Sequence, residues 1–138
     1  MVAQRRGHIV TIASLMGSIA QSQVADYCSS KFALVGFDMA LRFELELAKL
    51  SGFIKTTIVK THMIGTGMFA DRADRYPVAP LDPDSVARRI VTGIRLEELE
   101  VVMPSYISAF VRLYQLSPAN LAGCQVFGAF VAANQLAR

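Results

Sequence analysis

The alternation of strand and helix signals along the first sixty residues constrains this fold more than any other feature of the sequence. Residues 9–13 are apolar or β-branched without alternation, which is typical of a parallel strand buried on both faces. Residues 25–49 follow a helical pattern, and residues 54–59 form a second strand-like run. Two strands joined through one helix predict a right-handed crossover in a parallel sheet. The sequence therefore predicts an α/β fold.

Later signals extend this pattern. Ser51 and Gly52 are expected to end the long helix, with the glycine in the left-handed conformation. Asp82 and Pro83 are typical of a helix start, as cap and first residue, and residues 101–103 predict a short strand. The long helix is apolar around much of its circumference, so we expect it to be largely buried or to form an interface.

Two segments allow more than one interpretation. The linker at 69–81 is rich in charged residues and prolines, and either covers a substrate or is a plain surface connection. The apolar tail, residues 105–138, is interrupted too often for a transmembrane helix, and two helices broken at Pro118 are expected instead. These helices would line a substrate pocket, lie on a bilayer, pack a dimer or complete the core.

Composition excludes several classes of protein. A chain of 138 residues is ample for one hydrophobic core and short for two, and 53% hydrophobic residues indicate no disordered character. A net charge of +3 is too small to argue for nucleic acid, although an anionic membrane surface would suit the paired arginines. Cys28 and Cys124 lack metal-ligand spacing and are expected to be reduced thiols in a cytosol-facing protein.

The two histidines do not predict a zinc site, because His8 and His62 stand alone without further ligands at useful spacing. His62 follows the second predicted strand, near the edge of the sheet where ligands bind. An ordinary loop histidine is the simpler interpretation, and contact with a substrate is the alternative.

Ser14, Tyr27 and Lys31 carry the chemical signal. Tyr27 and Lys31 are four residues apart and would share one helix face, and Ser14 follows the first predicted strand. A phenol exchanges a proton with an alcohol only if its pKa falls below the usual value of about 10, which a nearby ammonium achieves. The same residues also fit an ordinary helix aromatic, a solvated lysine and a turn-capping serine.

The surrounding sequence resembles the short-chain dehydrogenase/reductase family of the classical type. Residues 7–14, GHIVTIAS, and residues 26–33, DYCSSKFA, place the serine, tyrosine and lysine in that family's order and spacing. The resemblance implies that Tyr27 is the general acid/base, that Lys31 lowers its pKa and holds the nicotinamide ribose, and that Ser14 orients the substrate oxygen.

Further similarity lies downstream at residues 64–69, IGTGMF, where the family's pattern implies cofactor contacts by Ile64 and Thr66. This signature and the residues around Tyr27 resemble the branch with retinol dehydrogenases and 17-beta-hydroxysteroid dehydrogenases. The resemblance implies NAD or NADP as cofactor and a lipophilic alcohol or ketone as substrate. It also implies a homodimer through the long helix and a cytosol-facing place at the endoplasmic reticulum membrane or a lipid droplet.

The resemblance covers only the C-terminal half of such an enzyme, since no glycine-rich dinucleotide motif occurs in the sequence. The expected fold is a partial doubly wound, Rossmann-like parallel sheet over residues 1–104, followed by the helical tail at 105–138. We expect the chain alone to bind dinucleotide poorly. A family proline is also replaced within residues 60–63, KTHM, which is expected to loosen the cofactor edge.

Three hypotheses about function follow. The first is a hydride-transferring oxidoreductase with Tyr27 as its proton-transfer group. The second is a catalytically inactive fragment that acts only through packing or partner binding. The third is a membrane-surface module that uses the arginines and the apolar tail.

Overall fold

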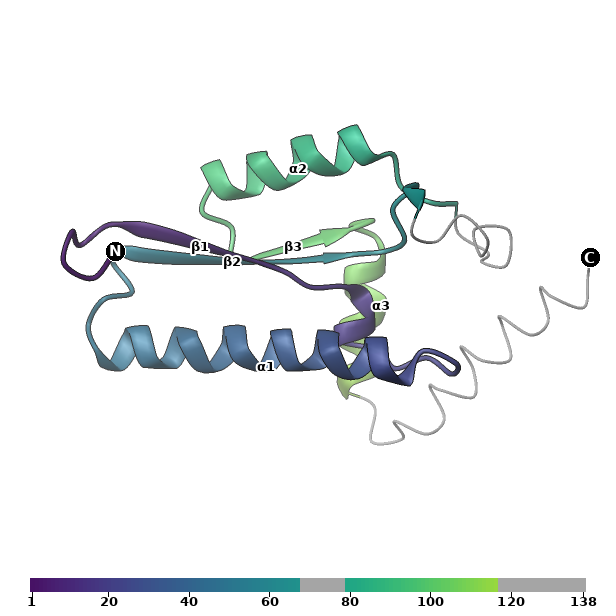
Figure 1. Cartoon of the computed structure of the whole chain (residues 1–138), viewed down its shortest axis with the longest axis horizontal. Helices are drawn as coiled ribbons and strands as arrows, with labels where there is room; N and C mark the ends of the chain where they lie inside the picture. Colours follow the sequence, from purple (N-terminus) through teal and green to yellow (C-terminus); the bar gives the residue numbers. More distant parts are fainter. Residues whose placement is uncertain (68–78, 117–138) are drawn as a thin grey trace, which may run out of the picture.

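The computed structural model describes residues 1–67 and 79–116, and it holds a three-stranded parallel sheet with helices on both faces (Figure 1). The strands are β1 (Gly7–Ile12), β2 (Ile54–Thr61) and β3 (Glu100–Met103), in that spatial order. Gly7 pairs with Ile54, and Ile58 pairs with Glu100. The parallel α/β arrangement expected from the sequence is confirmed.

Within the described residues, four helical segments surround the sheet. The helix α1 (Ala25–Leu47) lies on one face and α2 (Pro83–Arg95) on the other, as Figure 1 shows. The 3-10 turn η1 (Leu15–Gly17) lies between β1 and α1. The helix α3 (Ile107–Leu116) follows β3. This helix lies in the described part of the tail expected at residues 105–138; Pro118 and the second expected helix lie outside the described residues.

The core beneath α2 is aliphatic. Val59 of β2 and Val101 of β3 are fully buried and pack with Val86 of α2 and Met103. Gly93 of α2 allows the helix to approach the sheet, because a Cβ atom there would lie 2.4 Å from Val101 Cγ2. Burying one such valine contributes about 1.5 kcal/mol or more, so this cluster fixes α2 on the strands.

A second cluster lies on the opposite face and reaches the segment that follows β1. Leu15 and Ile19 are buried against Val111 of α3, with Val102 of β3 packed beside them. The turn η1 is therefore held from one side by α3. Because Ser14 precedes this turn directly, the packing of α3 helps to fix the end of β1.

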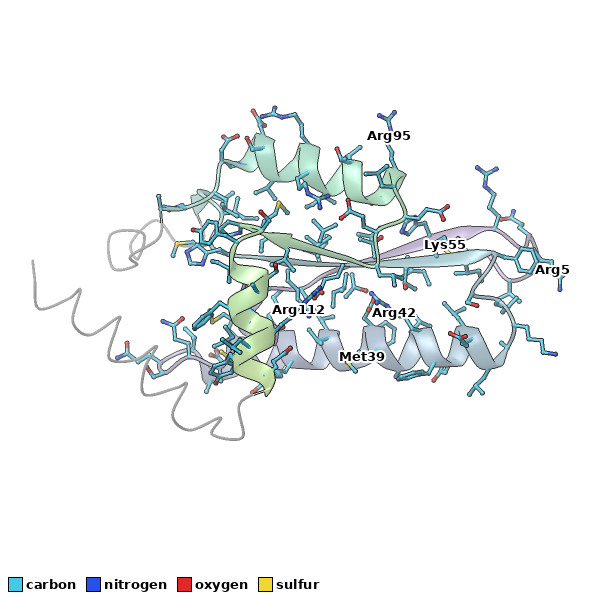
Figure 2. All side chains as sticks on the ribbon, turned by 180° about the vertical axis from the view of Figure 1, so that it is seen from behind. Arg5, Met39, Arg42, Lys55, Arg95 and Arg112 are labelled. Atoms are coloured by element: carbon cyan, nitrogen blue, oxygen red, sulfur yellow. The ribbon has the colours of Figure 1, made fainter. Side chains whose placement is uncertain are left out.

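The helix α1 carries a buried polar group on the side that faces the sheet. Asp38 is 1% exposed, accepts a hydrogen bond from the Thr11 hydroxyl at 3.3 Å, and pairs with Arg42 at 2.7 Å. Arg42, labelled in Figure 2, also donates to the carbonyl oxygen of Leu99 at 2.6 Å. A buried carboxylate requires such partners. These contacts tie α1 to β1 and to the residue before β3.

The end of α1 differs from the sequence-based expectation. The helix ends at Leu47, and the residue in the left-handed conformation is Lys49, with φ 56°, whereas no glycine of the described residues has positive φ. Lys49 N–H bonds Glu46 O, and Leu50 N–H bonds Leu45 O. The last carbonyl groups are thus satisfied before the chain reaches Gly52, so the prediction that Gly52 adopts the left-handed conformation is wrong.

The apolar circumference of α1 is only partly covered within the described chain. Its buried residues are Cys28, Asp38 and Leu45. Large apolar side chains that remain exposed on it are Phe32, Phe37, Met39, Phe43 and Leu47. The sequence predicted that this helix is either largely buried or part of an interface. These exposed side chains show that this face is not buried within the described chain. No helix in the described residues is long and apolar enough to span a bilayer.

The other boundaries agree closely with expectation. Asp82 caps α2 by accepting a hydrogen bond from Ser85 N–H at 2.8 Å, and Pro83 is the first helical residue, as predicted. The linker at 69–81 falls mainly outside the described residues. Leu81, which lies at the described end of this linker, forms a parallel bridge with Ile64.

Candidate active site

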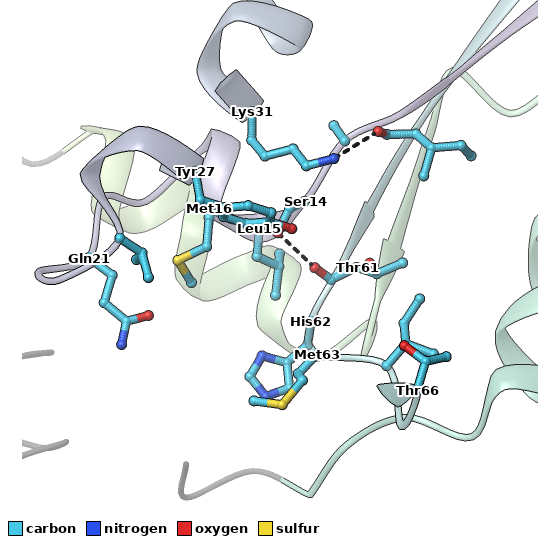
Figure 3. A pocket seen from close by; sticks show the side chains of 14 residues that line it. Ser14, Leu15, Met16, Gln21, Tyr27, Lys31, Thr61, His62, Met63 and Thr66 are labelled. Atoms are coloured by element: carbon cyan, nitrogen blue, oxygen red, sulfur yellow. Dashed lines mark hydrogen bonds between the residues drawn. The ribbon is translucent and has the colours of Figure 1, made fainter. Parts of the chain in front are cut away.

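A pocket of about 200 Å³ lies at the carboxyl ends of β1 and β2. Open parallel sheets bind ligands at this edge. The five site residues that the family resemblance implied line this pocket: Ser14, Tyr27, Lys31, Ile64 and Thr66. Figure 3 labels all of them except Ile64. They come from the end of β1, the first turns of α1 and the segment after β2, so the fold brings together three regions that are distant in sequence.

Ser14 is buried, with 6% of its surface exposed, and its hydroxyl has two partners. The oxygen accepts a hydrogen bond from Met16 N–H at 3.2 Å, and the hydroxyl donates to the carbonyl oxygen of Thr61 at 3.3 Å (Figure 3). Ser14 is thus the N-cap of η1. The two interpretations of this serine, as a turn cap and as a site residue, are both compatible with its position.

Tyr27 and Lys31 lie one turn apart on α1, and both reach the pocket. The Lys31 ammonium lies 5.5 Å from the centroid of the Tyr27 ring. It also donates a hydrogen bond to the carbonyl oxygen of Ile12 at 3.4 Å, at the end of β1 (Figure 3). The helical i,i+4 spacing therefore places a phenol and an ammonium in one cavity, as expected from the sequence.

The segment after β2 forms the facing wall. His62 N–H donates to Met103 O at 2.8 Å, and Leu81 N–H donates to Met63 O at 2.8 Å. Gly65 N–H donates to Leu81 O at 2.9 Å. The edge that was expected to loosen without the family's proline carries these backbone hydrogen bonds, and β2 extends through Thr61.

Ile64 and Thr66 differ in their surroundings. Ile64 is partly buried and packs against the core cluster beneath α2, whereas Thr66 is exposed at the pocket. The exposed Thr66 hydroxyl can both donate and accept hydrogen bonds, whereas the Lys31 ammonium can only donate them.

The other end of a dinucleotide finds no matching site in residues 1–67 and 79–116. A pyrophosphate requires a helix N-terminus with free N–H groups, usually behind a glycine-rich turn. Of the long helices, α1 begins after Val24 without a glycine, and α2 is capped by the Asp82 carboxylate, which repels an anion.

Sequence reasoning did not single out several residues that line the pocket. Met16, Gln21 and Val24 belong to the segment between Ser14 and Tyr27, and Met63 follows β2. Their positions beside predicted site residues could have identified them. His62 also lines the pocket, a position compatible with both interpretations offered for it, an ordinary loop histidine and a contact with a substrate.

The fold and the pocket define a partial Rossmann-like α/β domain with a serine, a tyrosine and a lysine at the carboxyl edge of its sheet. The family model described as short chain dehydrogenase matches residues 1–77, more than half of the chain. The chain belongs to the short-chain dehydrogenase family.

Relatives of known name support this assignment. The chain is 37% identical to short-chain dehydrogenase/reductase family 16C member 6 of Bos taurus, over 88% of the chain and 39% of the relative. It is 39% identical to epidermal retinol dehydrogenase 2 of Mus musculus, over 86% and 38%. It is 38% identical to human 17-beta-hydroxysteroid dehydrogenase 13, over 86% and 39%. The chain spans about two fifths of the length of these relatives.

Solved structures share the fold. A short-chain dehydrogenase/reductase from Burkholderia phymatum in complex with NAD aligns with a TM-score of 0.66 and 23% identity, covering 82% of this chain and 48% of that one. A short-chain dehydrogenase from Sphingobium yanoikuyae in complex with NADPH aligns with a TM-score of 0.67 and 18% identity, covering 88% and 47%. At these identities the alignments establish the fold alone.

Proposed function

We propose that the protein carrying this segment is an NAD- or NADP-dependent oxidoreductase that interconverts a lipophilic alcohol and its carbonyl compound. The observation that supports this most directly is the shared pocket of Ser14, Tyr27 and Lys31 at the carboxyl edge of the sheet. The family membership and the names of the relatives favour the same reaction class. Bound NAD(P) would supply the hydride acceptor or donor.

In the proposed reaction the chain's own residues handle the proton and the substrate oxygen. Tyr27 removes the hydroxyl proton in oxidation and returns it in reduction. The Lys31 ammonium, 5.5 Å from the centroid of the Tyr27 ring, supplies the positive charge that a deprotonated phenol requires. The Ser14 hydroxyl exchanges its hydrogen bond to the Thr61 carbonyl for one to the substrate oxygen, and so holds that oxygen beside the phenol.

The lining of the pocket favours an apolar substrate. Met16, Val24 and Met63 supply apolar side chains, and methionine adapts readily to irregular ligands. Two of the relatives are named for retinol and for 17-beta-hydroxysteroids. We therefore propose a retinoid or a steroid as the substrate class, with either reaction direction open to the same residues.

The cofactor assignment rests on the same pocket. Tyr27 and Lys31 would contact the nicotinamide ribose, and Ile64 and Thr66 the carboxamide and phosphates. Since neither α1 nor α2 begins behind a glycine-rich turn, we propose that a glycine-rich region outside the described residues supplies the pyrophosphate site. We therefore propose that hydride transfer belongs to the whole protein that carries this segment, hereafter the parent enzyme.

The decisive experiment is hydride transfer by the parent enzyme, followed by NAD(P)H absorbance with a retinoid and a steroid alcohol. Tyr27→Phe should lower kcat by about 10²- to 10⁴-fold. Tyr106→Phe is the matched control, because Tyr106 is exposed and does not line the pocket. Activity that survives in Tyr27→Phe would refute the assignment of proton transfer to this residue.

A second candidate function is association through α1, favoured by its exposed Phe43, which is 67% exposed, and by the neighbouring Met39 and Leu47. Exposed apolar side chains of this number usually mark an interface. We propose a homodimer through this face.

Phe43→Glu should shift the mass in analytical ultracentrifugation towards the monomer, and Glu44→Lys, on the same helix, should leave it unchanged. An unchanged mass in Phe43→Glu would exclude this face. Flotation with vesicles would show whether a membrane or lipid-droplet surface covers it instead.

A further inference from the structure

The turn that carries Ser14 rests directly on the helix that carries Tyr27 and Lys31, and the contact point is Gly17. This glycine is buried, and it is the last residue of η1. A Cβ atom placed on it would lie 2.6 Å from the carbonyl oxygen of Lys31 and 2.9 Å from its carbonyl carbon. It would also lie 2.9 Å from Val35 Cγ2. Any side chain at position 17 would therefore push η1 and α1 apart.

The two sides of this contact cannot yield easily. On one side the obstacle is backbone within a helix of 23 residues, which does not rotate away as a side chain does. On the other side Leu15 and Ile19 are buried against Val111 of α3, which holds the turn in place. Because η1 has three residues and α1 has 23, a displacement at residue 17 falls mainly on η1.

The turn is joined to Ser14 by hydrogen bonds. Gly17 N–H donates to Ser14 O at 3.0 Å, and Met16 N–H donates to the Ser14 hydroxyl oxygen at 3.2 Å. Gly17 and Ser14 thus move as parts of one closed turn. Whatever separates Gly17 from Lys31 also changes the position of the Ser14 hydroxyl relative to the phenol and the ammonium.

We propose that Gly17 is a positioning residue for the reaction: the missing side chain sets the distance between the Ser14 hydroxyl and the pair formed by Tyr27 and Lys31. This inference rests on the proposed function. Gly17 does not line the pocket, so its effect on catalysis is transmitted through the turn, chiefly through Ser14, whose carbonyl oxygen accepts the Gly17 N–H.

The test compares three glycine-to-alanine variants of the parent enzyme. Gly17→Ala should lower kcat by about 10- to 100-fold, with the KM for the dinucleotide changed less than about 2-fold, because a small displacement of a substrate-holding group costs catalysis. Gly93→Ala is the control for lost packing, since its Cβ would meet Val101 far from the pocket. It should lower Tm but leave kcat unchanged. Gly36→Ala meets no atom within 4 Å and should leave kcat unchanged.

Two further measurements separate positioning from general damage. In a Ser14→Ala background, Gly17→Ala should cost less than about 3-fold in kcat, since the group that it displaces is already absent. Adding Val35→Ala to Gly17→Ala should raise Tm without restoring kcat, because the Lys31 carbonyl remains in contact. Full additivity with Ser14→Ala, recovery of kcat by Val35→Ala, or failure of both Gly17 variants to fold would each overturn the proposal.

The failure of this inference is distinguishable from that of the proposed function. If Tyr27→Phe abolishes hydride transfer and Gly17→Ala retains it, only the positioning role is wrong. If Tyr27→Phe retains hydride transfer, the proposed function is wrong, and the role of Gly17 in catalysis falls with it.

Discussion

The hydroxyl of Ser14 donates a hydrogen bond to the carbonyl oxygen of Thr61, 3.3 Å away, and so links the end of β1 to the end of β2. Both residues are buried. The same hydroxyl oxygen accepts from Met16 N–H, so this one side chain satisfies a carbonyl and an amide at the floor of the pocket. In the structure without substrate, the serine proton is engaged by the protein itself.

Replacing Ser14 with alanine should therefore weaken the fold as well as the site. The change leaves the Thr61 carbonyl and the Met16 amide without that partner, which costs about 1–3 kcal/mol in the free energy of unfolding. Urea unfolding measures this loss. Ser29→Ala is the matched control, because the Ser29 hydroxyl is exposed and donates only to Ala25 O within its own helix. Equal stability of the two variants would contradict the proposed structural role of Ser14.

Replacing Asp38 with alanine should destabilise the protein by about 3 kcal/mol, since removing one partner of a buried ion pair leaves the other uncompensated. This expected loss of stability lies at the low end of the range for a broken buried ion pair, because 28% of the Arg42 side chain is exposed. The double variant Asp38→Ala with Arg42→Met should be more stable than Asp38→Ala alone. Lys55→Ala, which breaks the exposed pair with Glu97, should cost less than about 1 kcal/mol.

The stability of α2 should depend on pH through its cap. Hydrogen bonds from Ser85 hold the pKa of the Asp82 carboxyl below its ordinary value of 3.8. A depressed folded-state pKa contributes stability that is complete above the unfolded value and is lost as the pH falls through the folded value. The wild type should therefore lose stability below about pH 4 more steeply than Asp82→Asn. Acid titrations followed by circular dichroism that superimpose for the two proteins would contradict this.

Two glycines should respond in opposite directions to alanine. Gly93→Ala should cost about 1–3 kcal/mol, because its Cβ would lie 2.4 Å from Val101 Cγ2 in a packed core. Gly36→Ala should stabilise α1 by up to about 1 kcal/mol, since the site is open and alanine favours a helix. Denaturant midpoints measure both changes. A destabilised Gly36→Ala would indicate a contact at that face which the described chain does not contain.

The chain by itself should bind dinucleotide poorly, because the described residues provide no site for the pyrophosphate. Isothermal titration with NAD and with NADP should give dissociation constants well above the micromolar range. The parent enzyme serves as the reference. Micromolar affinity for the isolated chain would show that residues 117–138 or the linker supply the contacts that the described part lacks.

Local signals were enough to predict most of the elements. The cap at Asp82 and the proline after it predicted the start of α2, and the apolar runs predicted β1 and β2 to within two residues. These features depend on interactions within a few residues, which the sequence displays directly. The end of α1 did not follow this logic, since Lys49 rather than a glycine accepts the left-handed conformation.

The sequence by itself determined the parallel α/β order and the spacing that gives Tyr27 and Lys31 a common helix face, because strand and helix periodicity are local properties. Only the tertiary structure decided which side chains that helix buries: Asp38 is 1% exposed, whereas Phe43 is 67% exposed. Burial depends on what a helix packs against, and Thr11 and Arg42 supply the partners that make a buried carboxylate tolerable. For the same reason, the approach of Gly17 to Lys31 became visible only when η1 and α1 were in place.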